Sequence, residues 1–174
     1  MREANVPPDG ATETSILLAA SRNAHVPLED IDTVVAHFEA NGVQRNTKIC
    51  GALMQVYRNS EVLSTDVRLQ RGDALLTWMR HAGVPRDVEV YNPLLSACSA
   101  ALEFRKAHGV FRAMIDDEVV PSGRTFSIMV NMCSEENNME KGREYHELRE
   151  SMRLVLGVPA GSGSPWDVDD AENW

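Results

Sequence analysis

The chain has 174 residues, of which 43% are hydrophobic and 25% charged, and its formal net charge is −9. This composition predicts a soluble globular fold with one sizeable core and excludes a chain that is disordered throughout. No apolar run approaches the roughly 20 residues of a membrane-spanning helix, so we expect no membrane partner.

The acidity is concentrated at the two ends of the sequence. Residues 1–46 and 161–174 together carry −8, which leaves −1 for residues 47–160. A negative net charge disfavours a nucleic-acid partner. The middle of the chain is nevertheless close to neutral, and it remains open to contact with a phosphate backbone although it forms no basic patch.

Two further features concern the cellular compartment. The chain has an odd number of cysteines, Cys50, Cys98 and Cys133, and no two of them form a C-x-x-C pair. This argues against a disulfide scaffold or a zinc site and fits a reducing compartment. The first eight residues lack the character of a signal or transit peptide. We therefore expect any targeting segment to lie outside this chain, in a longer gene product.

The predicted elements are pairs of helices that recur about every 35 residues. In chain order, residues 1–9 are predicted to be the tail of a preceding repeat, and the repeats span 10–46, 47–87 (with an insertion at 59–68), 88–122 and 123–160. Closing segments such as Gly83-Val84-Pro85 mark the boundaries, because Gly tolerates the left-handed turn after a helix and Pro prevents the helix from continuing. Residues 161–174 are predicted to be an acidic flexible tail.

Apolar residues at three- and four-residue spacing predict the core face of each helix. For residues 10–46 these are Ile16, Leu17, Leu18, Ala20, Ile31, Val34, Val35 and Phe38. For residues 47–87 they are Cys50, Leu53, Met54, Tyr57, Leu75, Leu76 and Met79. For residues 88–122 they are Val90, Tyr91, Leu94, Leu95, Cys98, Phe104, Ala107, Val110, Phe111 and Met114.

The period is clearest between the last two repeats. With an offset of 35 residues, apolar positions fall on apolar positions and two cysteines coincide: Tyr91 on Phe126, Leu94 on Met129, and Cys98 on Cys133. Small residues recur at one place in the second helices, namely Gly72, Ala107 and Gly142. No segment has the period-two alternation of a strand, so the sequence predicts an all-α stack of helix-turn-helix repeats.

These repeats resemble the pentatricopeptide repeat family. The resemblance rests on Tyr91-Asn92-Pro93-Leu94-Leu95, on the segment from Ala107 to Met114, and on the closing Val120-Pro121-Ser122. It covers residues 10–160 and is strongest over 88–122. The closing segments fit this family better than the tetratricopeptide family, whose Trp and Leu-Gly signature is absent. The resemblance implies a right-handed α-solenoid that binds single-stranded RNA along a concave groove, one base per repeat.

By resemblance, the fifth and last residues of each repeat read a base. The pairs are Thr14 with Asn46, Gly51 with Asp87, Asn92 with Ser122, and Ser127 with Ala160 or Gly161. The first pair resembles the adenine-reading type, and the third leans toward pyrimidine. Gly51 and the partner of Ser127 have no side chain that can bond to a base. Lys48 and Arg124, each one residue after a repeat begins, are the candidate phosphate contacts.

Each of these residues also has a simpler interpretation. Thr, Ser and Asn at helix starts are commonly capping or surface residues, and basic side chains are commonly solvated. Cys98 and Cys133 are expected to be buried apolar side chains rather than metal ligands.

Enzyme chemistry is not predicted, because the sequence has no Gly-rich phosphate loop, nucleophile elbow or set of metal-binding carboxylates. We therefore expect no catalytic residues, no metal and no cofactor. The resemblance implies a role in RNA processing, stability or translation in a mitochondrion or chloroplast. The alternative is a protein-interaction scaffold that keeps the helical repeats without reading RNA, which the net charge and the incomplete base-reading pairs favour.

Overall fold

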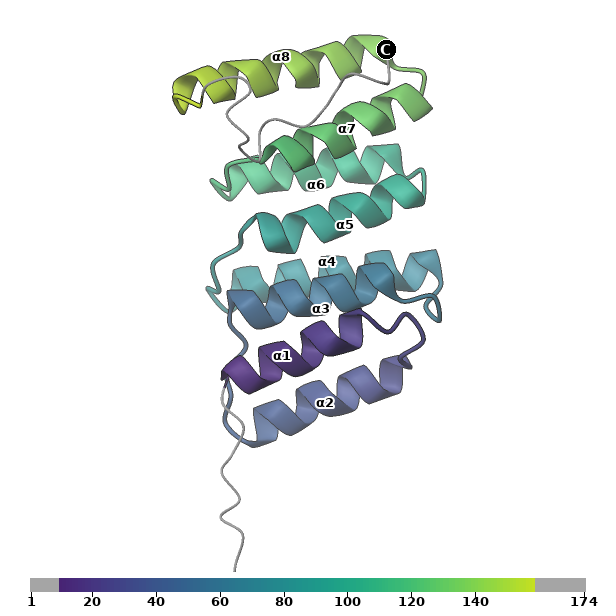
Figure 1. Ribbon diagram of the computed structural model, residues 1–174, viewed down its shortest axis with the longest axis vertical. Helices are drawn as coiled ribbons and strands as arrows, with labels where there is room; N and C mark the ends of the chain where they lie inside the picture. The colour runs from purple at the N-terminus through teal and green to yellow at the C-terminus, as the bar shows by residue number, and fades with distance from the viewer. Residues whose placement is uncertain (1–9, 159–174) are drawn as a thin grey trace, which may run out of the picture. The chain divides into compact units, whose positions relative to one another are not determined.

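The computed structural model describes residues 10–158, and the chain is helical throughout this range, without a strand. Its helices are α1 (Gly10–Ser21), α2 (Leu28–Ala40), α3 (Thr47–Asn59), α4 (Thr65–His81), α5 (Val88–Ala100), α6 (Phe104–Asp116), α7 (Gly123–Glu135) and α8 (Met139–Val155) (Figure 1). The chain divides into two compact units between Arg86 and Asp87. The predicted tails, 1–9 and 161–174, lie outside the described residues.

Local side-chain chemistry explains where most of these helices begin. Five helices follow a polar residue whose side chain accepts a hydrogen bond from a backbone N–H in the first turn. These residues are Asn46, Ser64, Asp87, Ser122 and Asn138. An unpaired N–H at a helix start is costly to bury, so these caps stabilise the starts of α3, α4, α5, α7 and α8.

The turns after the second helices adopt the left-handed conformation that the closing segments predict. Gly42, Gly83 and Gly157 have φ values of 80°, 67° and 67°, which glycine adopts without the steric cost of a Cβ atom. After α6 the same conformation falls on Glu118, with φ 58°. Glycine therefore occupies the left-handed position at three of these turns, as predicted, and Glu118 occupies it at the fourth.

In the first unit, α1 packs against α3, and α3 packs against α4 (Figure 1). Leu17 and Leu53 are buried in α1 and α3. The Asn59 side chain donates to the backbone oxygen of Ser21 at 2.8 Å, which joins the ends of α1 and α3. Arg71 of α4 pairs with Asp32 of α2 at 3.1 Å.

The predicted core face of α1 was partly wrong. Leu17 is 1% exposed, whereas Ile16 and Leu18 are each 41% exposed. Consecutive residues of a helix point about 100° apart, so a single neighbouring helix cannot cover all three side chains. Of these three side chains, Leu17 is the buried one.

In the second unit, α5 packs against α6 and α7, and α7 packs against α6 and α8. The Tyr91 hydroxyl, buried between helices, donates to the Ala113 carbonyl oxygen at 3.3 Å and contacts the carboxylate of Asp117. Phe111 of α6 meets the rings of Phe126 and Tyr145 edge-on, at centroid distances of 5.8 Å and 5.0 Å. Tyr91 and the three rings thus join all four helices of the unit.

The small residues in the second helices are buried, as the sequence predicts: Gly72, Ala107 and Gly142. The insertion expected at 59–68 is shorter in the structure, because residue 59 belongs to α3 and residues 65–68 belong to α4. The connection between α3 and α4 is residues 60–64, and α4 has 17 residues where α6 has 13. The excess length of this segment is therefore partly an extra helical turn.

In the part of the chain that the structure describes, no helix is both long enough and apolar enough to cross a membrane.

The three cysteines are buried, as expected, and their side chains are thiols rather than disulfides: Cys50, Cys98 and Cys133. Burial raises the pKa of the Cys50 and Cys133 thiols to about 11. Because the thiolate is the reactive form, we expect thiol reagents at pH 8 to modify these two residues on the order of 100-fold more slowly than a free cysteine.

Mass spectrometry after timed alkylation would measure this, with the denatured chain as the control in which all three cysteines react. Rapid modification of Cys50 in the folded protein would show that the α3 core opens without global unfolding.

Candidate nucleic-acid interface

The candidate residues lie in the first turns of the first helices and in the connections that precede them. In the first unit, Asn46 is exposed at the start of α3, where its Oδ1 accepts from the Ile49 N–H at 3.0 Å. Lys48 is exposed in the first turn of α3, and Thr14 is half-buried in α1. Gly51 is buried within α3. The connection before α3 also lies close to the one after α4, because the Thr47 hydroxyl donates to the Pro85 carbonyl oxygen at 2.7 Å.

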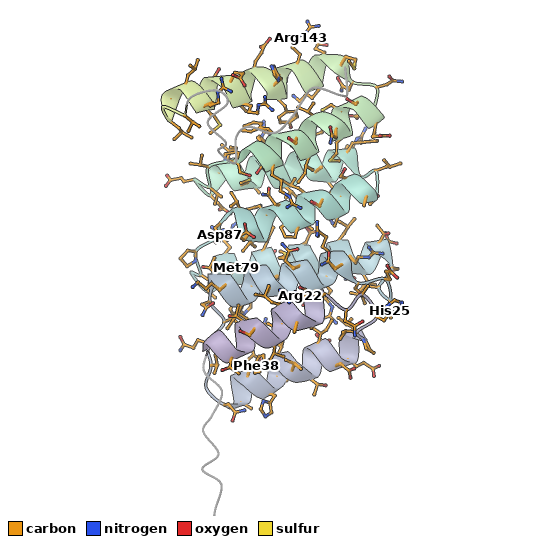
Figure 2. The ribbon with its side chains drawn as sticks, viewed as in Figure 1. Arg22, His25, Phe38, Met79, Asp87 and Arg143 are labelled. Atoms are coloured by element: carbon orange, nitrogen blue, oxygen red, sulfur yellow. The ribbon has the colours of Figure 1, made fainter. Side chains whose placement is uncertain are left out.

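In the second unit, Asp87 lies at the start of α5 (Figure 2), and its Oδ1 accepts from the N–H groups of Glu89 and Val90 at 3.0 Å and 3.2 Å. Arg124 is exposed in the first turn of α7. The Ser127 hydroxyl donates to the Gly123 carbonyl oxygen at 3.1 Å. The interpretation of early polar residues as helix caps therefore holds for Asn46 and Asp87.

One of the predicted pairs is in contact. Asn92 of α5 and Ser122, which caps α7, are 30 residues apart in the sequence, and Asn92 Nδ2 lies 3.4 Å from Ser122 Oγ. This is a long hydrogen bond between the two side chains expected to face one base. The partner expected for Ser127, residue 160 or 161, lies outside the described residues. Gly51 and Asp87 belong to different units.

Thr125 also contacts this pair, although the sequence did not predict a role for it. Its hydroxyl donates to Asn92 Oδ1 at 2.7 Å, and the same oxygen accepts from the Ser122 N–H at 3.0 Å. The Thr125 N–H in turn donates to Ser122 Oγ, which completes a capping box. Two signals were available in the sequence. Ser122-x-x-Thr125 is a capping pattern, and Thr125 is polar where the two preceding repeats have Ile49 and Val90.

Charge around the candidate residues is balanced or negative. Residues 10–86 carry equal numbers of basic and acidic side chains, whereas residues 87–158 carry a net −4. Several basic side chains are already paired: Arg45 with Glu39 at 2.6 Å, Arg71 with Asp32, and Arg153 with Glu150 at 3.1 Å. Phosphate attraction would therefore depend on a few exposed residues, of which Lys48 and Arg124 are two.

Within residues 10–158, no three His, Cys, Asp or Glu side chains are grouped as metal ligands.

Comparison with known proteins identifies the repeats. Residues 86–135, which include the Asn92–Ser122–Thr125 cluster, match the PPR repeat family. A mitochondrial pentatricopeptide repeat-containing protein of Arabidopsis thaliana is 28% identical over 137 residues, which are 78% of this chain and 13% of that protein. The chain is similar to pentatricopeptide repeat proteins over most of its length. A second mitochondrial pentatricopeptide repeat-containing protein of the same plant is 33% identical over 61 residues, or 35% of this chain and 6% of that protein.

The chain spans a small part of the length of these relatives. Its fold also matches a solved structure of the family, the PPR domain of Arabidopsis thaliana protein-only RNase P 1 in complex with tRNA. The match has a TM-score of 0.70 at 17% identity and covers 95% of this chain and 81% of that chain. The predicted all-α solenoid class is therefore confirmed.

Proposed function

We propose that this pentatricopeptide-like module binds single-stranded RNA through residues of its first helices. The observation that carries the proposal is the contact between Asn92 and Ser122, since these are the residues that the family pattern assigns to one base. The structural likeness to a PPR domain in complex with tRNA supports RNA as the class of partner. The mitochondrial relatives favour a role in processing, stability or translation of mitochondrial transcripts.

The base-reading residues differ in what they offer a base. Asn92 with Ser122 presents a carboxamide and a hydroxyl, a combination that we propose favours a pyrimidine. Thr14 with Asn46 presents the same two kinds of group, but Asn46 Oδ1 already accepts from the Ile49 N–H. Ser127 has no described partner residue, and Asp87 is paired in the pattern with Gly51, which has no side chain. Sequence preference is therefore expected to be strongest at the nucleotide that faces Asn92.

Selection from a randomised single-stranded RNA pool with the full chain tests this function. Because part of the affinity would come from phosphate contacts, binding should weaken steeply as salt rises, with one nucleotide position enriched. Absence of any binding at low salt would reject RNA recognition by this chain.

Replacing Arg124 with Gln tests the phosphate contacts. We expect weaker binding to all RNA sequences by a similar factor, and a salt-dependence slope that is shallower by about 0.7, the value for one lost contact to a single strand. Titrations at several salt concentrations would measure both.

Arg105→Gln is the matched control. Arg105 is also the second residue of its helix and is also exposed, but it lies in α6, a second helix. Equal effects of the two substitutions would mean that only general charge matters.

A protein-interaction scaffold is the second candidate function. The net −4 of residues 87–158 and the missing side chain at Gly51 favour it. The salt titration separates the two candidates, because a scaffold without RNA readout gives no salt-dependent RNA binding.

A further inference from the structure

The Asn92 carboxamide sits in a cluster whose hydrogen bonds are directional. Thr125 is 0% exposed and Asn92 9% exposed, so the bonds between them are shielded from water. The Thr125 Oγ1 to Asn92 Oδ1 distance of 2.7 Å is the shortest in the cluster. Asn92 Nδ2 lies on the other side, 3.4 Å from Ser122 Oγ.

The Thr125 hydroxyl has two acceptors within reach, Asn92 Oδ1 at 2.7 Å and Ser122 Oγ at 3.1 Å. Thr125 Oγ1 accepts the Ser122 N–H at 3.0 Å, and its single proton is then available to donate. Asn92 Oδ1 is the nearer of the two acceptors and can only accept, so it receives that proton. Ser122 Oγ accepts the Thr125 N–H and is placed to accept from Asn92 Nδ2. The carboxamide oxygen therefore faces Thr125 and its nitrogen faces Ser122.

A carboxamide held in this way offers a defined pattern to a base. One lone pair of Oδ1 and one Nδ2 proton are engaged within the cluster, which leaves one acceptor and one donor site. Rotation of the carboxamide by 180° would exchange these sites, and a base edge that fits one orientation would not fit the other. Because so little of Asn92 is exposed, a base would meet only the edge that this orientation presents.

The hydrogen bonds of Thr125 and Ser122 to Asn92, which we call the clamp, occur at one of the junctions between repeats within residues 10–158. The clamp uses the third residue of a repeat to hold the fifth residue of the repeat before it. At the junction that follows Thr14 the corresponding third residue is Ile49, and at the junction that follows Gly51 it is Val90. Neither of these side chains can form a hydrogen bond.

We infer that Thr125 is a specificity-determining positioning residue, which selects the base read by Asn92 by holding its carboxamide in one orientation. This inference rests on the proposed RNA-binding function. Thr125 itself need not touch RNA, because its effect passes through Asn92. The prediction is that removal of its hydroxyl changes base preference at one nucleotide.

The test compares Thr125→Val, which removes the hydroxyl at nearly constant volume, with Thr125→Ser, which keeps it. RNA pools selected with the wild-type chain and with Asn92→Ser first locate the nucleotide whose preference depends on Asn92. Affinities for four RNAs that differ only at that nucleotide are then measured for each variant. A good base-edge contact discriminates about tenfold, so we expect this ratio to fall toward one in Thr125→Val and to persist in Thr125→Ser.

A purely structural role gives a different result. Thr125→Val also removes a capping bond, so its melting temperature is recorded alongside affinity, and uniform weakening for all four RNAs with an unchanged ratio would overturn the inference. An unchanged ratio together with wild-type affinity would overturn it as well. Failure of the wild-type chain to bind RNA would instead reject the proposed function.

A measurement without RNA tests the clamp itself. In the wild-type chain the Nδ2 protons of Asn92 should exchange slowly with water, because the carboxamide is buried and hydrogen-bonded on both sides. Faster exchange is expected in Thr125→Val but not in Thr125→Ser. Identical exchange in all three proteins would mean that Thr125 does not hold the carboxamide.

Discussion

Phe111→Ala is expected to lower the free energy of unfolding by about 3–5 kcal/mol, the usual cost of removing a buried aromatic side chain. Phe111 is 6% exposed, and its ring lies against Phe126 of α7 and Tyr145 of α8. The substitution would leave a cavity where three helices meet. The helices cannot close this cavity without losing other packing contacts. Chemical denaturation followed by circular dichroism measures the loss.

Ile115→Ala in the same helix is the matched control. Ile115 is 41% exposed, and we expect a change of less than about 1 kcal/mol. Similar losses for the two variants would mean that the core face of α6 has been assigned wrongly.

Leu17→Ala is the second substitution with a large expected effect, about 2–5 kcal/mol. Leu17 is buried where α1 packs against α3, and truncation would open a cavity in that contact. Its neighbour Leu18 is the same residue type in the same helix but is largely exposed, so Leu18→Ala should cost less than about 1 kcal/mol.

The comparison of Leu17 with Leu18 needs no other control, because helix propensity and the change in side-chain size are identical. Thermal and chemical denaturation of the two variants would measure the difference. If Leu18→Ala destabilised the protein as much as Leu17→Ala, the orientation of α1 on α3 would have to be revised.

The helical character of the chain was predictable because its signals are local. Apolar residues three and four positions apart define one face of a helix, and Leu53 and Leu94 are buried as this spacing predicts. Gly42 and Gly83 ended their helices as expected, since a left-handed turn favours glycine wherever it occurs. These predictions needed no knowledge of which helix packs against which.

The candidate site was predictable only in part. Family resemblance pointed to Asn92 and Ser122, and the two side chains are in contact. Thr125 was missed, because its bond to Asn92 joins residues 33 positions apart and forms only when α7 packs against α5. A capping pattern indicates a helix start, but it does not reveal which residue of another helix lies beside it.

By itself, the order of residues determined that this protein is built of helix pairs and where its turns fall, because helix periodicity and turn chemistry act between residues close in the chain. It also pointed to the family that the repeats resemble. Only the tertiary structure decided that Leu17 rather than Leu18 enters the core, and that Thr125 holds the Asn92 carboxamide. Both depend on the rotation of one helix against another, which results from the packing of many side chains together and is encoded in no single segment.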